Sequence, residues 1–178
     1  MSQDITIKKA LVSDAVASKF ATEKETPYTR WVAEQGLEIQ DAIYVRNLHT
    51  VELKPWAGRG GRGVFLNHDA SRTSNDAYVC EIPAGSQLEP QRQLFEEMVY
   101  ILDGRGSTTV WNDAGQKVSF EWSAGSIFAI PLNTLHQHFN GSGKDVARFV
   151  SVTNAPAIIN AFGDIDFVFN TQYDFKNR

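Results

Sequence analysis

The sequence predicts an all-β protein, built as an antiparallel sandwich or barrel. Two observations lead to this prediction. From residue 43 onwards, short apolar segments alternate with polar residues at a period of two, as half-buried strands do. Gly, Pro, Asn and Asp separate these segments, and Asn112 to Gly115 has the composition of a hairpin turn. Many short strands with regular turn residues are typical of closed or stacked antiparallel sheets.

The first part of the chain predicts helix rather than strand. Residues 1–25 are polar and mixed, and Ala10–Phe20 could form a short helix or an arm lying on a neighbouring subunit. A clearer helix begins at Thr26, which can cap it, and Pro27, which suits the first helical position. Gly36 is a usual residue just after a helix end. The expected apolar face of this helix carries Tyr28, Trp31 and Val32.

Strands are expected from residue 43 to residue 152, and a last helix at Pro156–Phe162. The glycine-rich stretch Gly58–Gly63 predicts a flexible loop between two of them. The expected organisation is a helical extension or arm over residues 1–42, a barrel over 43–155, and a tail over 156–178 that packs on the barrel. The predicted strands are Ile43–Arg46, Leu48–Leu53, Val64–Leu66, Ala77–Ile82, Met98–Leu102, Ser107–Trp111, Val118–Trp122, Ser126–Ile130, Leu135–Phe139 and Ala147–Val152.

Composition narrows the classes of function. A chain of 178 residues most often forms one domain with a real core, and 42% hydrophobic residues is ordinary for a globular protein. The net charge of −4 argues against a nucleic-acid partner. Cys80 is the single cysteine, so no internal disulfide can form, which fits a reducing compartment. The sequence shows no signal-peptide core and no run long enough to span a membrane, so we expect a cytoplasmic protein.

Two segments carry most of the residues with chemical potential. The first runs from Gly85 to Gly104 and contains Gln91, Gln93 and Glu97. The second runs from Gly125 to Asn140 and contains Pro131, Asn133, His136 and His138. Residues i and i+2 of a strand share one face, so Gln91 is expected to point with Gln93, and His136 with His138.

The spacing in both segments resembles the two signature motifs of the cupin superfamily. The first motif is Gly, five residues, His-x-His, three or four residues, Glu, six residues, Gly. Gly85, Glu97 and Gly104 fall on it, whereas Gln91 and Gln93 replace both histidines. The second motif is matched by Gly125, Pro131, His136 and Asn140, with Asn133 at its middle glycine. The resemblance covers about residues 60–155.

This resemblance implies a single double-stranded β-helix, the jelly-roll or cupin barrel, with the N-terminal helical extension and a short C-terminal helix added. It also implies one divalent metal (Fe, Mn, Zn or Ni) held by residues 91, 93, 97 and 136. A Gln amide oxygen is a much weaker ligand than imidazole for these metals. The site is therefore expected to hold one metal or none. His138 could complete a set of two imidazoles and Glu97, the composition of a facial triad.

Each candidate also has an alternative reading. Gln91, Gln93 and His138 could bind substrate. The two glutamines could instead hydrogen-bond each other, Glu97 or water in a polar pocket. Glu97 is costly in apolar surroundings, so it is bound to metal, hydrogen-bonded or protonated. His136 is a catalytic candidate or a buried neutral histidine. Arg59 and Arg62 could close over an anionic substrate or form a surface turn. His49 and His68 have no partner at useful spacing, so we expect structural roles for them.

Three functions are compatible with these residues. The first is a metal-dependent, dioxygenase-like oxidoreductase acting on a small organic substrate. The second is a metal-free or weakly metal-binding cupin, either a ligand-binding module or an isomerase or lyase that uses Glu97 and His136 as acid and base. A storage role is disfavoured by the presence of one barrel. We expect a homodimer in which residues of the first forty reach the partner. All these readings require Glu97 and His136 to face one hollow.

Overall fold

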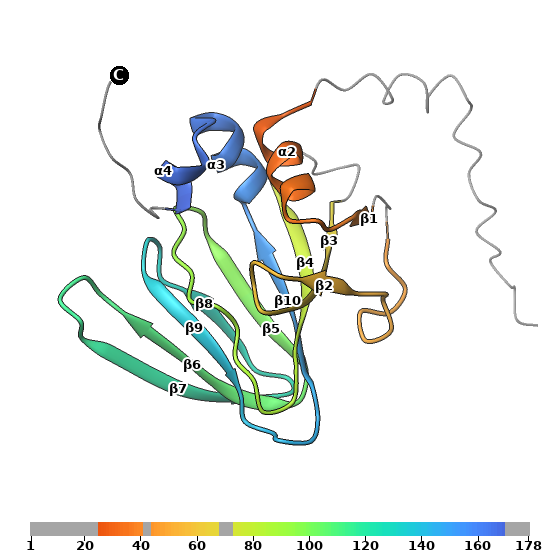
Figure 1. Cartoon of the computed structure of the whole chain (residues 1–178), viewed down its shortest axis with the longest axis vertical. Helices are drawn as coiled ribbons and strands as arrows, with labels where there is room; N and C mark the ends of the chain where they lie inside the picture. Colours follow the sequence, from red (N-terminus) through yellow and green to blue (C-terminus); the bar gives the residue numbers. More distant parts are fainter. Residues whose placement is uncertain (1–24, 41–43, 68–72, 170–178) are drawn as a thin grey trace, which may run out of the picture.

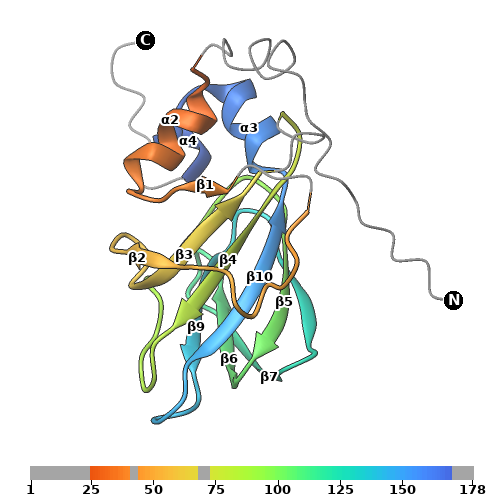
Figure 2. The same ribbon diagram turned by 90° about the vertical axis from the view of Figure 1, so that its right-hand side faces the viewer.

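Two β-sheets face each other, and three short helices gather at one end of them, in the computed structural model of residues 25–40, 44–67 and 73–169 (Figures 1 and 2). The all-β jelly-roll prediction is confirmed. The strands are β1 (Ile39–Gln40), β2 (Lys54–Trp56), β3 (Gly61–Leu66), β4 (Asp76–Ile82), β5 (Glu97–Asp103), β6 (Arg105–Trp111), β7 (Lys117–Ser123), β8 (Ile127–Ile130), β9 (Leu135–Asn140) and β10 (Ala147–Thr153).

The larger sheet joins strands that are distant in the sequence. Its order is β1-β3-β4-β10-β5-β8, with β2 paired to β3, and the smaller sheet has the order β7-β6-β9. In the larger sheet, β10 lies between β4 and β5. The register places Ser151 opposite Tyr78, and Thr153 opposite both Asp76 and Glu97. Polar residues of three strands therefore come together in one region.

Alternation along the strands decides which of these side chains face inward. In β5, Glu97, Val99 and Ile101 are buried, whereas Met98 and Tyr100 are exposed. In β9, burial alternates so that His136, His138 and Asn140 are buried. Because successive strand side chains point to opposite faces, these two strands send a carboxylate and two imidazoles into the space between the sheets.

The helices form as the sequence predicts at both ends. In α2 (Pro27–Glu34), Thr26 and Thr29 form a capping box, and the chain leaves the helix through Gly36 at φ 68°. The second expected helix is α3 (Ala155–Phe162), followed by α4 (Ile165–Phe169), which we did not expect. The predicted helix at Ala10–Phe20 lies outside the described residues. Among the described helices, none is long and apolar enough to cross a membrane.

Helix α2 is fixed to the barrel through its buried face. The centroid of the Trp31 ring lies 5.5 Å from the ring centroid of Phe65 in β3 and 5.2 Å from that of Phe169 in α4. The Tyr28 hydroxyl donates to Asp76 Oδ2 at 2.6 Å, and the Tyr28 N–H donates to Asn160 Oδ1 at 3.0 Å. The helix therefore packs on strands and C-terminal helices together.

Two expectations about the segment before β3 are wrong. Residues 44–53 form no strand. Val51 and Leu53 instead pack on Val64, Leu66, Val79 and Leu102, which form an apolar cluster on the outer face of the larger sheet. Within Gly58–Gly63, which was expected to be a flexible loop, residues 58–60 form a turn and residues 61–63 are the first residues of β3. Gly63 is required there, because a Cβ would lie 2.6 Å from Trp56 Cε3.

Candidate functional site

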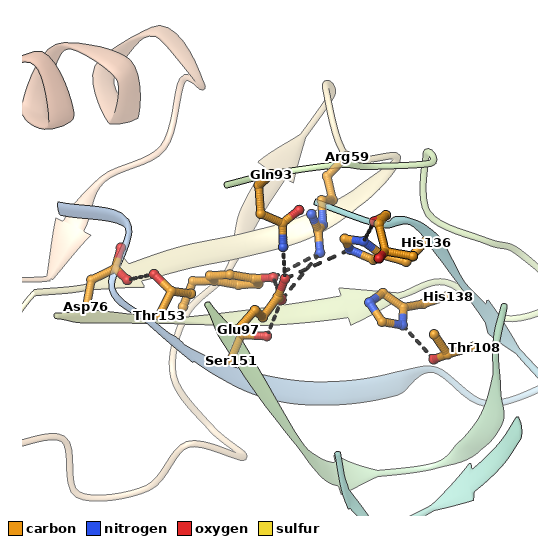
Figure 3. Close-up of polar contacts among 11 residues, drawn as sticks. Arg59, Asp76, Gln93, Glu97, Thr108, His136, His138, Ser151 and Thr153 are labelled. Carbon is orange, nitrogen blue, oxygen red and sulfur yellow. Dashed lines mark hydrogen bonds and ion pairs between the residues drawn. The ribbon is translucent and has the colours of Figure 1, made fainter. Parts of the chain in front are cut away.

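A buried carboxylate, Glu97, stands at the start of β5 and accepts hydrogen bonds from three side chains (Figure 3). Oε1 accepts from the Tyr78 hydroxyl of β4 and, at 2.8 Å, from Ser151 Oγ of β10. Oε2 accepts from Gln93 Nε2 at 2.6 Å. Hydrogen bonding of a carboxylate by neighbours favours its ionised form, so the Glu97 side chain is negatively charged.

Arg59 reaches the same point from the turn between β2 and β3. Its side chain is only 3% exposed, and its Nη2 lies 3.9 Å from Glu97 Oε1. The same Nη2 donates to the Tyr78 hydroxyl oxygen at 2.9 Å. The guanidinium also lies over two rings, 5.6 Å from the Trp56 centroid and 5.4 Å from that of Tyr78. An arginine of the glycine-rich segment Gly58–Gly63 therefore lies in the barrel interior.

These contacts set the charges of a buried cluster. We define this cluster as Arg59, Tyr78, Gln93, Glu97 and Ser151 together with His136 and His138 of β9. Burial would raise the pKa of Glu97, but the Arg59 charge, the neighbouring His136 and the hydrogen bond from Tyr78 outweigh it and lower the pKa from 4.5 to about 2. Burial also raises the pKa of Tyr78 well above its usual range, so the phenol stays neutral. Arg59 and Glu97 are consequently both charged at neutral pH, and the two charges cancel.

His136 and His138 reach the region of Glu97 from β9 (Figure 3). His136 Nε2 lies 3.9 Å from Glu97 Oε2. Burial lowers the pKa of His136, and its Nδ1 lies 3.2 Å from the Thr134 carbonyl oxygen. A carbonyl can only accept, so Nδ1 carries the proton and the Nε2 lone pair faces the cluster.

His138 is held by a polar chain of its own. Its Nδ1 lies 2.7 Å from Thr108 Oγ1, which also accepts from Trp122 Nε1 at 2.9 Å. Burial lowers the pKa of His138 well below 6.5, so this imidazole is neutral. The centroids of the His136 and His138 rings are 5.4 Å apart. The barrel interior thus presents two neutral imidazoles next to an arginine–carboxylate pair.

Several polar atoms of the cluster have no hydrogen-bond partner among the described residues. They are His136 Nε2, His138 Nε2, Gln93 Oε1 and Arg59 Nε, and all are buried. Leaving one such atom unpaired costs about 1–3 kcal/mol, and most buried polar atoms in proteins are paired. The cluster can therefore form hydrogen bonds with a bound polar molecule, either water or a ligand.

Not every residue expected at the site belongs to the cluster. Gln91 is half-buried and pairs through its backbone with His136, its N–H donating at 2.9 Å and its carbonyl accepting at 2.8 Å. Arg62 is exposed and donates to the Leu53 carbonyl at 2.6 Å. His49 is an exposed residue whose Nδ1 lies 2.7 Å from Asp103 Oδ2. His68 lies outside the described residues.

Two residues of the cluster were not identified from the sequence. Tyr78 and Ser151 both sit at buried positions of strands, opposite each other in the register. A tyrosine or serine among strand residues is common in sequence, and only the pairing of β4 with β10 brings both to Glu97. The signal that existed was the presence of polar residues at positions where alternation predicts burial.

A groove of about 480 Å³ opens beside the segments that carry the cluster. Three of its lining residues are chain neighbours of cluster residues: Gly58 precedes Arg59, Arg92 precedes Gln93, and Leu135 precedes His136. The complete lining is Trp31, Gln35, Gly58, Pro90, Gln91, Arg92, Leu135, Ile165 and Phe169. Helices α2 and α4 thus form one side of it.

The family model of the cupins, described as Cupin, matches residues 63–175. The chain belongs to the cupin family. This confirms the family suggested by the two motifs, and the match extends beyond them to the C-terminal helices.

Solved structures of cupins share the fold at low identity. The cupin domain of Cnp3 from Schizosaccharomyces pombe is 20% identical with a TM-score of 0.52, covering 74% of this chain and 82% of that one. Oxalate decarboxylase of Lactobacillus farciminis, in a formate complex, is 21% identical with a TM-score of 0.51, covering 62% of this chain. This cupin spans 32% of that decarboxylase. A search of curated proteins found no match.

The cupin fold implies a metal, and the Bacillus subtilis oxalate decarboxylase, 19% identical with a TM-score of 0.50, contains Mn(II) centres. The donors available in this chain are His136, His138, Glu97 and the amide oxygen of Gln93. They do not fit a divalent metal well. The Glu97 carboxylate is already engaged by three donors and faces Arg59, so a dication bound to it would meet a buried guanidinium. Within residues 25–40, 44–67 and 73–169, no three His, Cys, Asp or Glu side chains form a metal-binding group.

Proposed function

We propose that this cupin binds a small, neutral, hydroxyl-bearing molecule at the buried cluster. Two buried acceptors that find no hydrogen-bond partner within the described part of the chain, His136 Nε2 and Gln93 Oε1, carry this proposal. The Nε2 atom presents a lone pair because Nδ1 carries the proton. A hydroxyl group supplies the hydrogen that each of these atoms needs.

The charges of the cluster favour a neutral ligand. Arg59 and Glu97 offset each other, and both imidazoles are neutral. A charged molecule brought into this interior would lose its hydration and find no free opposite charge. Polyols, sugars and hydroxy ketones satisfy the acceptors without that cost.

The groove is lined by chain neighbours of Arg59, Gln93 and His136 but not by these residues themselves, and we propose it as the place for the part of the ligand outside the cluster. Its lining combines the rings of Trp31 and Phe169 with the amides of Gln35 and Gln91. Apolar walls with a few polar groups are the usual composition of small-molecule sites. In this proposal the hydroxyl end of the ligand meets His136, and the remainder occupies the groove, where Gln91 contributes to binding.

A panel of glycerol, erythritol, free monosaccharides and hydroxyacetone tests the proposal by thermal shift and calorimetric titration. A ligand at a hundred times its Kd stabilises the folded protein by about 2.7 kcal/mol. We expect one class of the panel to raise the Tm of the wild type and of His49→Ala, a matched surface variant, but not of His136→Ala. A panel that shifts no Tm, or that shifts all three proteins equally, would contradict ligand binding at this cluster.

A second candidate is an isomerase or lyase in which His136 acts as a base. It is favoured by the same Nε2 lone pair and by its separation of 3.9 Å from Glu97 Oε2, since a carboxylate stabilises the imidazolium formed when the base takes a proton. Proton exchange at the carbon next to the carbonyl of hydroxyacetone, followed by NMR in deuterated water, measures this step. We expect His136→Ala to abolish the exchange, and unchanged exchange would remove the candidate.

A further inference from the structure

We infer that Arg59 is the fixed cation of this barrel, in the electrostatic role that the motif resemblance assigns to a divalent metal. The guanidinium approaches Glu97 Oε1 to 3.9 Å and is joined to the same oxygen through the Tyr78 hydroxyl. The carboxylate that would ligate a metal is therefore already paired with a positive charge. The inference concerns the cluster itself and does not depend on the identity of an organic ligand.

Arg59 is held in this position by its backbone as well as by its side chain. Its N–H donates to the Trp56 carbonyl at 3.0 Å, and its own carbonyl accepts from the Glu89 N–H at 2.9 Å. The side chain lies over the rings of Trp56 and Tyr78, where a guanidinium is stabilised by their π-faces. Moving the cation out would break these contacts and leave Glu97 buried without its charge partner, which is costly.

Gln93 fits this arrangement better than the imidazole that the cupin motif has there. Its Nε2 donates to Glu97 Oε2 at 2.6 Å, so the carboxylate receives a neutral donor on the side opposite Tyr78 and Ser151. Tyr78 and Ser151 satisfy Oε1, Gln93 satisfies Oε2, and Arg59 supplies one positive charge without a metal. We therefore infer that the loss of the motif imidazole and the presence of Arg59 are linked, and that restoring the imidazole alone does not create a metal site.

Four proteins test the inference: the wild type, Gln93→His, Arg59→Met and the double variant. Each is incubated with Mn²⁺, Zn²⁺ or Co²⁺, desalted and subjected to elemental analysis, and the visible spectrum of bound Co²⁺ reports coordination by protein ligands. We expect stoichiometric metal only in the double variant, which offers the introduced imidazole together with His136 and Glu97 and lacks the guanidinium. With Arg59 in place, we expect an affinity at least about a hundredfold lower, since a like charge next to a buried site opposes a dication.

The controls distinguish the effect of the Arg59 charge from the effects of a smaller side chain and of misfolding. Gln93→His combined with Arg59→Lys keeps the positive charge and is expected to stay metal-free. If Arg59→Met does not fold, as judged by circular dichroism, Arg59→Gln replaces it with the same expected results. Stoichiometric metal in the wild type or in Gln93→His would overturn the inference, and so would a folded double variant that takes up none. The ligand panel above gives its result independently of these measurements.

Discussion

Replacing Glu97 by glutamine removes the negative charge of the cluster while keeping the size of the side chain. Arg59 then stays buried without a charge partner, and Tyr78 and Ser151 donate to a neutral amide. The pKa of Glu97, lowered from 4.5 to about 2, corresponds to roughly 3 kcal/mol in favour of the ionised form. Breaking a buried charge pair typically costs about 3–5 kcal/mol. We therefore expect Glu97→Gln to lose about 3–5 kcal/mol of unfolding free energy.

Urea unfolding at pH 7, followed by tryptophan fluorescence, measures this loss directly. For a chain of this size, the expected change corresponds to a decrease in Tm of roughly 6–20 °C. Glu96→Gln is the matched control, because Glu96 is the exposed neighbour and its variant should differ from the wild type by about 0.5 kcal/mol or less. A second variant, Glu97→Gln with Arg59→Met, should recover part of the loss. A decrease below about 1 kcal/mol for Glu97→Gln would refute the view of a buried, ionised carboxylate.

Three further predictions concern the rest of the molecule. Burial raises the pKa of Asp76 from 3.8 to about 6, so this group favours folding at low pH, and that contribution is lost as the pH rises from about 4 to 6. Asp76→Asn should abolish its share of the decrease in unfolding free energy over the same pH range. Tyr28→Phe removes the hydroxyl that donates to Asp76 and should lower the unfolding free energy, measured in urea, by about 1–3 kcal/mol. An unchanged unfolding free energy would contradict a stabilising role of this bond for α2. The expected homodimer should appear in light scattering and weaken when residues 1–24 are removed, whereas a monomeric wild type at micromolar concentration would disprove it.

The barrel strands could be predicted because each needs one buried face. Met98 to Leu102 alternates as a strand does, and β5 has the pattern that the sequence indicates. The segment Leu48–Leu53 shows where this reasoning fails. Its alternation is real, since Val51 and Leu53 are buried, but they are covered by packing on the outside of the sheet. A period of two indicates a face to bury and does not by itself indicate a hydrogen-bonded partner strand.

The candidate site could be predicted in part for the same reason. Motif spacing and alternation predict that Glu97 and His136 face the same part of the barrel interior, and His136 Nε2 lies 3.9 Å from Glu97 Oε2. The hydrogen bond from Gln93 to Glu97 is one of the alternatives that the sequence leaves open. Gln91 was expected to point with Gln93, but it forms only an isolated bridge with His136 and lines the groove instead. Its backbone belongs to no regular strand, so strict alternation does not apply there.

Arg59 could not be placed from the sequence. A glycine-rich segment with two arginines gives no sign of which one turns inward, and the structure separates them, Arg59 into the barrel and Arg62 onto the surface. That outcome depends on the rings of Trp56 and Tyr78, which come from different strands. Long-range pairing of this kind is a property of the assembled sheet and is not contained in local sequence patterns.

The attachment of α2 matters to anyone who shortens this chain for study. A fragment that begins where the family match begins, at residue 63, would lack α2, β1 and β2. It would uncover Phe65, deprive Asp76 of the Tyr28 donor, and lose Arg59 altogether. Such a fragment would expose apolar surface prone to aggregation and would carry an altered interior. Boundaries for expression should therefore start ahead of Thr26, even though the recognisable motifs begin much later in the chain, at Gly85.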